Sequence, residues 1–427
     1  MLTPGQTLSL TIDKPAAGGR MIARVDGQVV LVSGAIPGER VRARIERVGK
    51  GVAFAEAIAI EEASSDRRAP FGDPLCGGNL FGHITYPRQL AIKGQVIADA
   101  FARIGHMTLP SAVRVAASPE DGYRMRARLH LRGHRIGFFR EATHEICDAR
   151  ATRQLLPATC DTIDRLSAAI TSLGVQDVRE IELSENVEAS ERVVHLDTVQ
   201  AIDSREVEKI ASVDGLTPGP HVTDVLTIGG ATLTLRRHVL AFFQGNRYLL
   251  RDLVAHVAEQ VPIGTTLLDL YAGAGLFSIA AGVIRGAWVV AVEGDRCAAD
   301  DLRANTAAAG ARITAVAGAV ERVATGYRQM IAQHDAPRDI ETVIVDPPRT
   351  GMTREALDAT LALSPSRLVY VSCDVATLAR DARRIVDAGY TIDRADAFDL
   401  FPNTPHVETV AVFDRHELRT QNSELRT

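Results

Sequence analysis

The chain has 427 residues, which is too long for one ordinary hydrophobic core, so two or three domains are expected. Its content of 46% hydrophobic and 24% charged residues is typical of a soluble globular protein. The formal net charge of −5 argues against a protein that coats nucleic acid indiscriminately, although local basic clusters can still bind phosphate.

Targeting signals and a disulfide framework are not expected. The N-terminal stretch MLTPGQTLSLTIDKPAAGG lacks the cationic segment and apolar run of a secretory signal. No apolar run reaches the roughly 18 residues that a membrane helix needs, and Arg285 interrupts the best candidate. The five cysteines are odd in number and widely spaced. We therefore expect a cytoplasmic protein with no membrane partner, and a monomer by default.

Residues 1–61 read as a small β-barrel. Short alternating strands (TLSLTI, MIARV, QVVLV, ERVRARIERV, AFAEAIAI) are separated by turn signals, and five such strands in about 60 residues fit a closed barrel of the OB type. Residues 1–60 hold eight Lys or Arg against five Asp or Glu, a balance of +3. The segment SSDRRAPFGDP then breaks the pattern and is typical of a linker.

Residues 70–236 predict a mixed α+β domain whose topology the sequence leaves open. Helices are expected over 87–105 and 151–173, and a hairpin turning at Arg132-Gly133 lies between them. Residues 121–140 contain six arginines and only Asp121 as an acid, a balance of +5. This concentration favours an RNA-binding role, and a merely solvated face is the alternative.

Residues 239–416 alternate buried strands with helices, which predicts an α/β domain with a doubly wound, mostly parallel sheet. Residues 417–427 are expected to form a disordered tail.

A cofactor loop is predicted where the strand ending at Asp269-Leu270 meets a helix. Gly273 and Gly275 let backbone approach a ligand closely, and the helix that follows offers free N–H donors. Ser278 occupies the third glycine position of the dinucleotide fingerprint, which disfavours NAD. Glu293 ends the next strand 20 residues after Gly273, where a carboxylate can accept both hydroxyls of a ribose. The pattern favours a nucleoside ligand.

The turn Asp346-Pro347-Pro348-Arg349 follows the strand ETVIVD and leaves two interpretations open. Similar turns in many methyltransferases hold an amine that is being methylated, which indicates an N-methyltransferase. Alternatively, the prolines only stiffen a turn that ends a strand.

Cys373 and Glu408 are the candidate catalytic pair. Cys373 follows the strand RLVYVS, and Asp374 and Thr377 are expected to cap the next helix, whose positive end favours a thiolate. Glu408 lies in HVETVAVF, a last strand expected to run antiparallel and so to begin near Cys373. A buried structural cysteine and a solvent-facing glutamate are the alternatives.

A thiol and a carboxylate beside S-adenosylmethionine suit methylation of C5 in uracil. C5 is too weak a nucleophile until a thiolate adds to C6, and a base must later remove the C5 proton. N-methylation needs neither group.

The ordered motifs FFQGN, DLYAGAGLFSI, VEGD, DPPRTG, VSCDVATLARD and DLFPNTPHVE resemble the TrmA/RumA family of RNA uracil-C5 methyltransferases. The N-terminal barrel with GAIPGERV looks like a TRAM domain, and YRMRARLHLRGHRIGFFREATHEICDA looks like the family's central-domain signature. The resemblance implies a Rossmann-like class I methyltransferase domain. It also implies that Cys373 is the nucleophile and Glu408 the base. The S-adenosylmethionine contacts that it implies are Gln244, Tyr271, Glu293 and Asp346. The target uridine is expected to be flipped into the pocket.

The chain departs from the family at the iron–sulfur site. Several members hold a [4Fe–4S] cluster with four cysteines, but here the central run reads Cys76-Gly77-Gly78-Asn79 and the upstream position is Pro70. Only Cys76 and Cys147 match ligand positions, so we expect no cluster and no metal. Cys160 and Cys297 are expected to be structural.

Three functions are therefore weighed: an RNA uracil-C5 methyltransferase, an N-methyltransferase on the same fold, and a catalytically inactive RNA-binding protein. The RNA substrate is ribosomal or transfer RNA. The barrel favours ribosomal RNA, by analogy alone.

Overall fold

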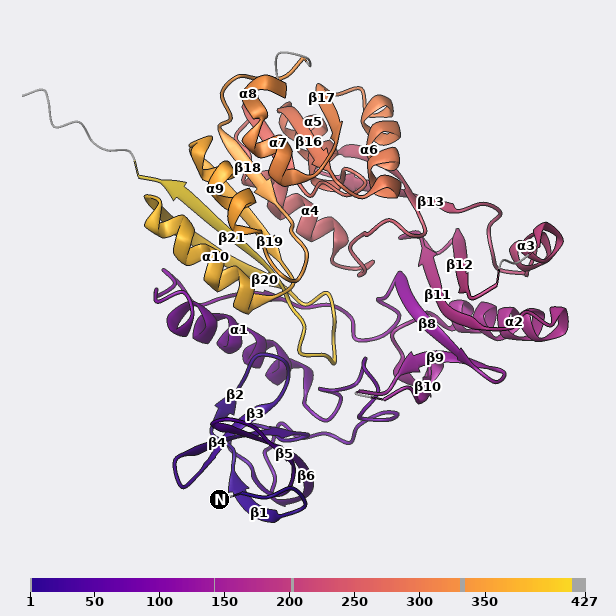
Figure 1. Cartoon of the computed structure of the whole chain (residues 1–427), viewed down its shortest axis with the longest axis vertical. Coiled ribbons are helices and arrows are strands. Elements are labelled where there is room, and N and C mark those ends of the chain that lie inside the picture. Colours follow the sequence, from indigo (N-terminus) through magenta and orange to yellow (C-terminus); the bar gives the residue numbers. More distant parts are fainter. Residues whose placement is uncertain (1, 142, 201–202, 331–334, 417–427) are drawn as a thin grey trace, which may run out of the picture.

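The computed structural model describes residues 2–141, 143–200, 203–330 and 335–416, and the predicted tail at 417–427 lies outside them. Three β-structures divide the chain: a barrel at the N-terminus, a central sheet, and a large sheet flanked by helices (Figure 1). None of the helices within the described ranges is long and apolar enough to cross a membrane.

The barrel has six strands in the order β1-β5-β6-β4-β3-β2, one more than predicted. Its strands are β1 (Thr7–Thr11), β2 (Lys14–Pro15), β3 (Met21–Val25), β4 (Gln28–Ser33), β5 (Arg40–Val48) and β6 (Val52–Glu62). The additional β2 is short and pairs with the start of β3. Alternate side chains of β3, β4 and β5 are buried, which is the period of two that the sequence showed.

The central sheet has the order β10-β9-β8-β11-β12 and is packed against helix α2. Its elements are β8 (Arg126–Arg132), β9 (Arg135–Phe139), β10 (Ile146–Asp148), the 3₁₀ turn η1 (Arg150–Thr152), α2 (Pro157–Leu173), β11 (Val178–Glu185), β12 (Arg192–Thr198) and α3 (Ser204–Ala211). The predicted hairpin is β8–β9, which pairs Arg132 with Arg135 across the turn.

The large sheet has the order β17-β16-β15-β18-β19-β21-β20-β7, so the predicted doubly wound α/β class is confirmed. Strands β15 to β19 are parallel, and β21 runs antiparallel to both its neighbours. Its strands are β7 (Val115–Ala116), β15 (Thr266–Leu270), β16 (Trp288–Glu293), β17 (Ile313–Ala317), β18 (Thr342–Val345), β19 (Arg367–Ser372), β20 (Tyr390–Phe398) and β21 (Glu408–Arg415). The helices are α4 (Leu250–Glu259), α5 (Leu276–Arg285), α6 (Arg296–Ala308), α7 (Val320–Thr325), α8 (Tyr327–Met330), α9 (Arg354–Ala362) and α10 (Val375–Asp387).

Some segments that the sequence grouped with residues 70–236 pack on the large sheet. Helix α1 (Tyr86–Arg103) buries Ile92 in the barrel core and Phe101 in the core of the large sheet, so it joins the two (Figure 1). Strand β7 extends the large sheet by pairing with β20. The hairpin of β13 (His221–Ile228) and β14 (Ala231–His238) shares a core with α4 and α5. An amphipathic pattern shows that one face of an element is buried, but it does not show which other element covers that face. The sequence alone therefore could not assign a packing partner to these elements.

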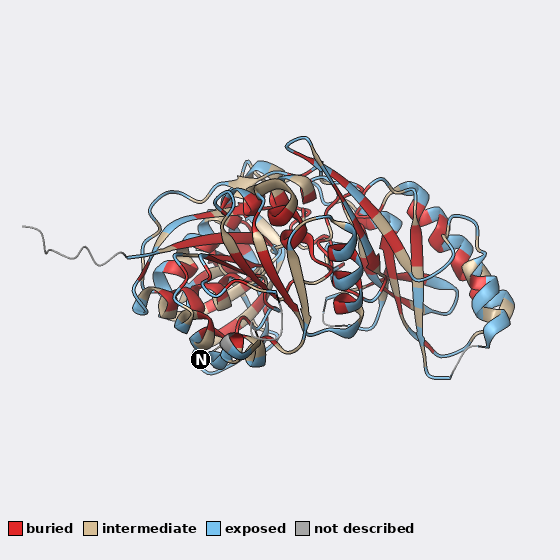
Figure 2. Ribbon diagram, turned by 90° about the horizontal axis from the view of Figure 1, so that it is seen from above, coloured by how far each residue is buried: buried red, intermediate tan, exposed pale blue. Residues whose placement is uncertain are grey.

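The joint between the central and large sheets is polar and buried. Glu185, at the end of β11, is fully buried and accepts hydrogen bonds from Arg192 and Arg247, the second of which lies just before α4. Buried charges of opposite sign stay stable only with such complete pairing. The central strands of the large sheet are almost wholly buried and the outer faces of its helices are exposed, so its core lies between the sheet and the helices (Figure 2).

Candidate active site

The candidate residues lie along one edge of the large sheet. Strands β15, β16, β18 and β19 are parallel, so their carboxyl ends meet at this edge, where α/β proteins bind ligands. Strand β21 returns antiparallel to β19 and pairs Thr409 with Ser372. Glu408 and Cys373, the next residues after this pair, are therefore at the same edge, and the charge of Glu408 acts on the pKa of Cys373 although the two lie far apart in the sequence. Glu408 is only 2% exposed, so the solvent-facing alternative is wrong.

The loop after β15 has the backbone that a close ligand contact requires. Tyr271, Gly273 and Gly275 all have positive φ, at 63°, 57° and 96°. Gly275 caps α5, and a Cβ there would lie 2.9 Å from Cδ1 of Leu302, so only glycine fits. The free N–H groups at the start of α5 face the same edge.

Glu293 holds this loop in place. Its Oε2 accepts from the backbone N–H of Gly273 at 2.7 Å, and its Oε1 accepts from that of Asp295 at 2.6 Å. The carboxylate therefore lies beside the glycine loop, where the sequence predicted a ribose contact.

Gln244 and Asp346 meet across the site. Nε2 of Gln244 donates to Oδ2 of Asp346 at 3.1 Å, and Gln244 is 3% exposed. The two residues come from different parts of the chain, the segment before α4 and the turn after β18, so the structure brings together what the sequence could only list separately.

Several buried carboxyl groups gather at this edge of the sheet. Burial, with the charge of Asp269 next in size, raises the pKa of Asp346 to about 7. Burial also raises the pKa of Asp269 to about 7, and Ser278 donates to its Oδ2 at 2.5 Å. The pKa of Glu408 is raised well above its ordinary value by burial and then by Asp346. Such a site stabilises a cationic ligand, and S-adenosylmethionine carries a sulfonium and an ammonium group.

The surroundings of Cys373 disfavour its thiolate, which is the reverse of the effect expected from the helix end. Burial and then the charge of Glu408 raise the pKa of Cys373 to about 12, whereas Arg349 acts in the opposite direction. Asp374 does cap α10, because its Oδ1 accepts from the N–H groups of Ala376 and Thr377 at 3.0 and 2.9 Å. The capping carboxylate offsets the positive helix end that was expected to favour the thiolate.

Arg349 and Phe242 are site residues that the sequence reasoning did not assign. Arg349 follows the proline turn and is a cation that favours ionisation of Cys373. Phe242 is 62% exposed next to the Gln244 segment, and the guanidinium of Arg126 lies 5.8 Å from its ring centroid. Arg349 belongs to the motif DPPRTG and Phe242 to the motif FFQGN. Their positions in these motifs were the signal from which the sequence could have indicated a role at the site. An exposed aromatic ring is suited to stacking on a base.

The loop that leads into Glu408 is anchored from helix α1. Lys93 and Asp399 are both buried and form an ion pair of 2.5 Å, and Nζ of Lys93 also donates to the carbonyl of Phe401 at 3.1 Å. Gln89 exchanges two hydrogen bonds with Asn403, both at 2.9 Å. This polar anchoring fixes the loop and thereby the position of the glutamate.

Cys76 and Cys147 form a disulfide, which the sequence reasoning did not expect. The fold brings together two cysteines 71 residues apart by pairing Cys76 with Arg140, directly after β9, the strand that neighbours β10. Asn79, at the third cluster position, is fully buried and donates to the carbonyls of Phe71 and Asp73. With both sulfur atoms bonded to each other and an amide at the third position, these residues do not fit a [4Fe–4S] cluster.

The remaining cysteines and acids do not gather into a metal site in the part of the chain that the structure describes. Among those residues, no group of three or more His, Cys, Asp or Glu side chains is arranged to hold a metal ion. Cys160 is buried and Cys297 half-buried, and both are free.

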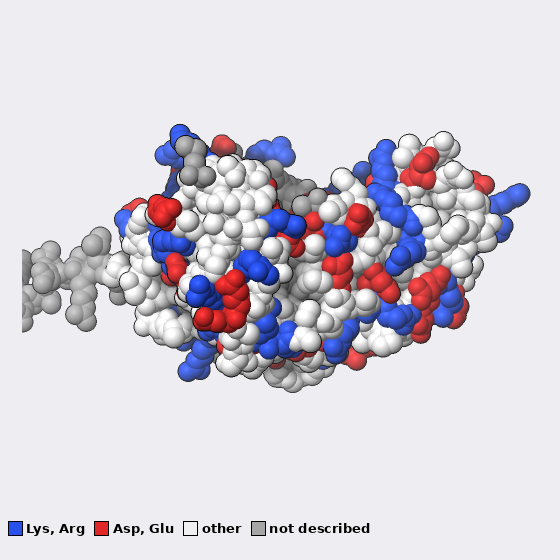
Figure 3. Space-filling model, turned by 90° about the horizontal axis from the view of Figure 1, so that it is seen from below, with Lys and Arg blue, Asp and Glu red and all other residues white. Residues whose placement is uncertain are grey.

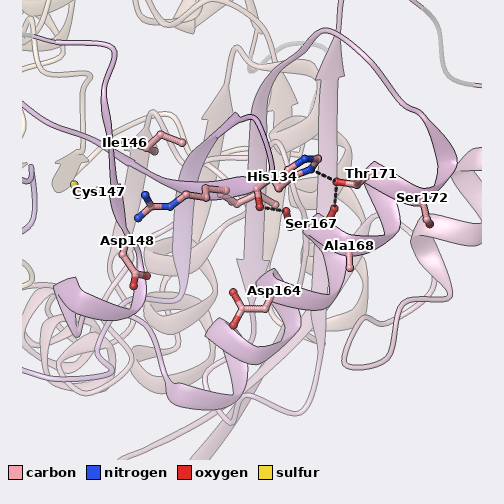
Figure 4. Close-up of a pocket in the computed structure, with 11 residues that line it drawn as sticks. His134, Ile146, Cys147, Asp148, Asp164, Ser167, Ala168, Thr171 and Ser172 are labelled. Carbon is pink, nitrogen blue, oxygen red and sulfur yellow. Dashed lines mark hydrogen bonds between the residues drawn. The ribbon is translucent and has the colours of Figure 1, made fainter.

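A separate cavity of about 600 Å³ opens in the central domain between α2 and the β9–β10 region (Figure 4). Oγ of Ser167 donates to the carbonyl of His134 at 2.7 Å, and the His134 ring lies 3.1 Å from Oγ1 of Thr171. The sulfur atom in its lining is that of Cys147, which is already bonded to Cys76. This cavity shares no residue with the candidate site at the edge of the large sheet, so we assign no catalytic role to it.

Comparison with known proteins agrees with this geometry. The family model described as tRNA (uracil-5-)-methyltransferase matches residues 185–416, and the TRAM domain model matches residues 2–58. A 23S rRNA (uracil(1939)-C(5))-methyltransferase RlmD from Halomonas elongata is 34% identical, with 95% of this chain and 89% of the relative covered. An uncharacterized RNA methyltransferase from Nitratidesulfovibrio vulgaris is 29% identical, with 97% of each chain covered.

Among solved structures, the Pyrococcus abyssi tRNA (uracil-54, C5)-methyltransferase in complex with S-adenosyl-L-homocysteine has the same fold. Its TM-score is 0.73 at 24% identity, with 95% of this chain and 99% of that chain covered. The family model spans more than half of the sequence, and the Halomonas relative spans nearly all of it. The chain therefore belongs to the tRNA (uracil-5-)-methyltransferase family, whose members are S-adenosylmethionine-dependent RNA uracil-C5 methyltransferases.

Proposed function

We propose that this protein methylates C5 of a uridine in RNA, with Cys373 as nucleophile and Glu408 as base. The observation that supports the assignment is the register of β19 and β21, which pairs the neighbouring residues Ser372 and Thr409 at the sheet edge, together with the influence of the Glu408 charge on the pKa of Cys373. The neighbouring carboxyl groups and the glycine loop fit a cationic nucleoside, and S-adenosylmethionine bound there supplies an electrophilic methyl group.

Cys373 acts first. Its thiol gives up its proton to solvent water, a step that the positive charge of Arg349 favours, and its sulfur forms a bond to C6 of the uracil. The C5=C6 electron pair moves toward C5 and O4 as an enolate, which makes C5 nucleophilic enough to take the methyl group. Gln244 and Asp346 are proposed to hold the methyl donor and the uracil in register.

Glu408 completes the reaction. Its carboxylate removes the proton from C5, the C5=C6 bond re-forms, and the bond between Cys373 and C6 breaks, so that the thiolate is released. The raised pKa of Glu408 suits this role, because a carboxylate with a higher pKa is a stronger base near neutral pH.

The barrel and the central domain are proposed to bind the RNA around the target. In the barrel, the guanidinium of Arg47 lies 3.4 Å from the ring centroid of Phe54. In the central domain, His130 stacks on Phe139 with centroids 3.5 Å apart, at the edge of a cavity of about 610 Å³. A band of basic side chains crosses the right half of the face in Figure 3. Stacking surfaces beside cations are suited to unpaired bases and phosphates.

We propose ribosomal RNA as the substrate. We also propose that the protein is a monomer and acts in the cytoplasm. Relatives from Halomonas elongata and Acidithiobacillus ferrooxidans are 23S rRNA methyltransferases by name, at 34% and 32% identity. The Pyrococcus abyssi protein with the same fold is named for transfer RNA. Mass spectrometry of ribosomal and transfer RNA from a deletion strain decides the matter, because one 5-methyluridine is expected to disappear from the ribosomal fraction.

Trapping with 5-fluorouridine tests the chemistry. Fluorine at C5 cannot leave as a proton does, so a transcript containing it should form a denaturation-resistant complex with the protein and S-adenosylmethionine. The complex should be absent for Cys373→Ala and present for Cys297→Ala, a control at another free cysteine. An N-methyltransferase would give no complex, and Cys373→Ala would then keep full activity. An inactive RNA-binding protein would fail to bind S-adenosylmethionine in calorimetry.

A further inference from the structure

A small cavity of about 110 Å³ lies on the side of Cys373 that faces the barrel. Cys373 lines it, whereas Glu408, Gln244 and Asp346 do not, so it is separate from the proposed cofactor side of the site. Its walls come from three parts of the chain: the β2–β3 turn of the barrel, helix α1 with the loop before it, and the segments next to the two proposed catalytic residues. In Figure 1 the loop between β20 and β21 extends toward the barrel, beside α1.

The barrel turn is packed against the segment that leads into the proposed base. Gly19 has φ +91°, and a Cβ there would lie 2.9 Å from Cγ of Pro405, which comes three residues before Glu408. The N–H of Phe81 donates to the carbonyl of Asn403 at 2.8 Å and ties the same loop to the segment before α1. The barrel turn is therefore a wall of the catalytic site and not part of a detached module.

The lining of the cavity suits a neutral planar group. Ile92, Phe81 and Val375 give it buried apolar walls. Lys93 and Asp374 also line it, but the ammonium group of Lys93 is paired with Asp399 and Oδ1 of Asp374 accepts from the first N–H groups of α10, so both charged groups already have partners.

The cavity is open and of the size of one ring. The exposed residues at its edge, which open it to solvent, are Ala17, Gly18 and His406. At about 110 Å³ the cavity is smaller than the apolar cavities of about 150 Å³ that enclose benzene, so it can take a single ring only because its edge is open.

We propose that this cavity receives the base of the nucleotide directly adjoining the target uridine, so that the barrel turn takes part in substrate selection. The inference rests on the proposed function, because a uracil bonded to Cys373 places the next nucleotide of the strand beside the cavity. Splayed bases in single-stranded RNA are commonly bound against apolar and aromatic side chains, and the ring of His406 offers such a surface at the edge.

The experiment is a double-mutant cycle between protein and RNA. Ala17→Trp fills the cavity from the barrel turn, and Ala16→Leu is a second, smaller filling variant. Ala63→Trp, at an exposed alanine that does not line the cavity, is the matched control. The RNA probe is the transcript that wild-type protein methylates, prepared intact and with an abasic nucleotide on either side of the target uridine. Single-turnover methylation and RNA binding are measured separately.

We expect one abasic position to lower the wild-type methylation rate about tenfold, and Ala17→Trp to lower the rate on intact RNA by a similar factor. Combining the two should cause no further loss, because both remove the same contact. Ala63→Trp should behave as wild type on every transcript. Multiplicative losses, or no effect of either abasic position, would overturn the inference. Wild-type protein that methylates no intact transcript would instead contradict the proposed function, so the two failures are distinguishable.

Discussion

Cys373 and the Cys76–Cys147 pair show how differently one residue type behaves in two regions of the same molecule. Cys373 lies at the end of a parallel strand, half-buried, with Glu408 and Arg349 as charged neighbours. Cys76 and Cys147 lie in the central domain, where both are buried and bonded to each other. The surroundings decide the chemistry: a free thiol beside a base and a cation can react, whereas a bonded pair only joins two segments. The following predictions test that contrast.

Loss of the reactive sulfur should have the largest effect. Cys373→Ala is expected to lower kcat by roughly 10⁴-fold or more, since the variant lacks the atom that adds to C6. Binding of S-adenosylmethionine, measured by calorimetry, should change little. Substantial methylation by the purified variant would show that the sulfur is not the nucleophile.

Loss of the base should have the next largest effect, of a different kind. Glu408→Gln is expected to lower turnover about 10²- to 10⁴-fold while still allowing the methyl group to reach C5. A methylated covalent complex between protein and unmodified RNA should then accumulate on denaturing gels. If turnover falls but no complex forms, Glu408 acts before methyl transfer and the assigned role is wrong.

Removal of the disulfide should affect stability and not chemistry. Cys76→Ser is expected to lower the free energy of unfolding by about 2–4 kcal/mol, because the bond closes a long loop. Denaturant unfolding with and without reductant measures this loss. The kcat of the folded variant should match wild type, and a fall in kcat at a temperature where the variant is fully folded would contradict a purely structural role.

The pH dependence of cofactor binding should show the smallest effect. Asp346 and Asp269 have pKa values raised to about 7, and a bound cation favours their ionised forms. Affinity for S-adenosylmethionine is therefore expected to be highest above pH 7 and to fall about tenfold between pH 8 and pH 6 as a carboxylate becomes protonated. Calorimetric titrations across this range measure the change.

The free energy of unfolding of the ligand-free protein should respond to pH in the direction opposite to the affinity for S-adenosylmethionine. A carboxyl group whose folded-state pKa lies above its unfolded value stabilises the fold at low pH. This contribution is lost as the pH rises from the unfolded value of about 4 through the folded-state pKa of about 7. Thermal unfolding without ligand between about pH 5 and pH 8 measures this. Asp346→Asn should reduce both dependences, and an unchanged affinity profile in that variant would exclude Asp346 as the titrating group.

Local patterns in the sequence were sufficient for the fold class and for some candidate residues, whereas Gln244 and Tyr271 came only from the family resemblance. The period of two in the barrel, the strand–helix alternation after residue 239 and the Gly273–Gly275 turn are all set by neighbouring residues, so each could be predicted locally. The proximity of Glu408 to Cys373 was expected from an antiparallel last strand; β21 does run antiparallel to β19, and their register pairs the neighbouring residues Thr409 and Ser372.

Only the tertiary structure decided what those elements pack against and how their groups ionise. Helix α1 joins the barrel to the large sheet, the barrel turn borders the cavity beside Cys373, and Cys76 meets Cys147 across 71 residues. The resting thiol of Cys373 also depends on burial and on charges from distant segments. The periodicity of apolar residues shows that one face of a helix or strand is buried. The packing partner of that face, the distances between side chains and their pKa values are set only when segments remote in sequence come together.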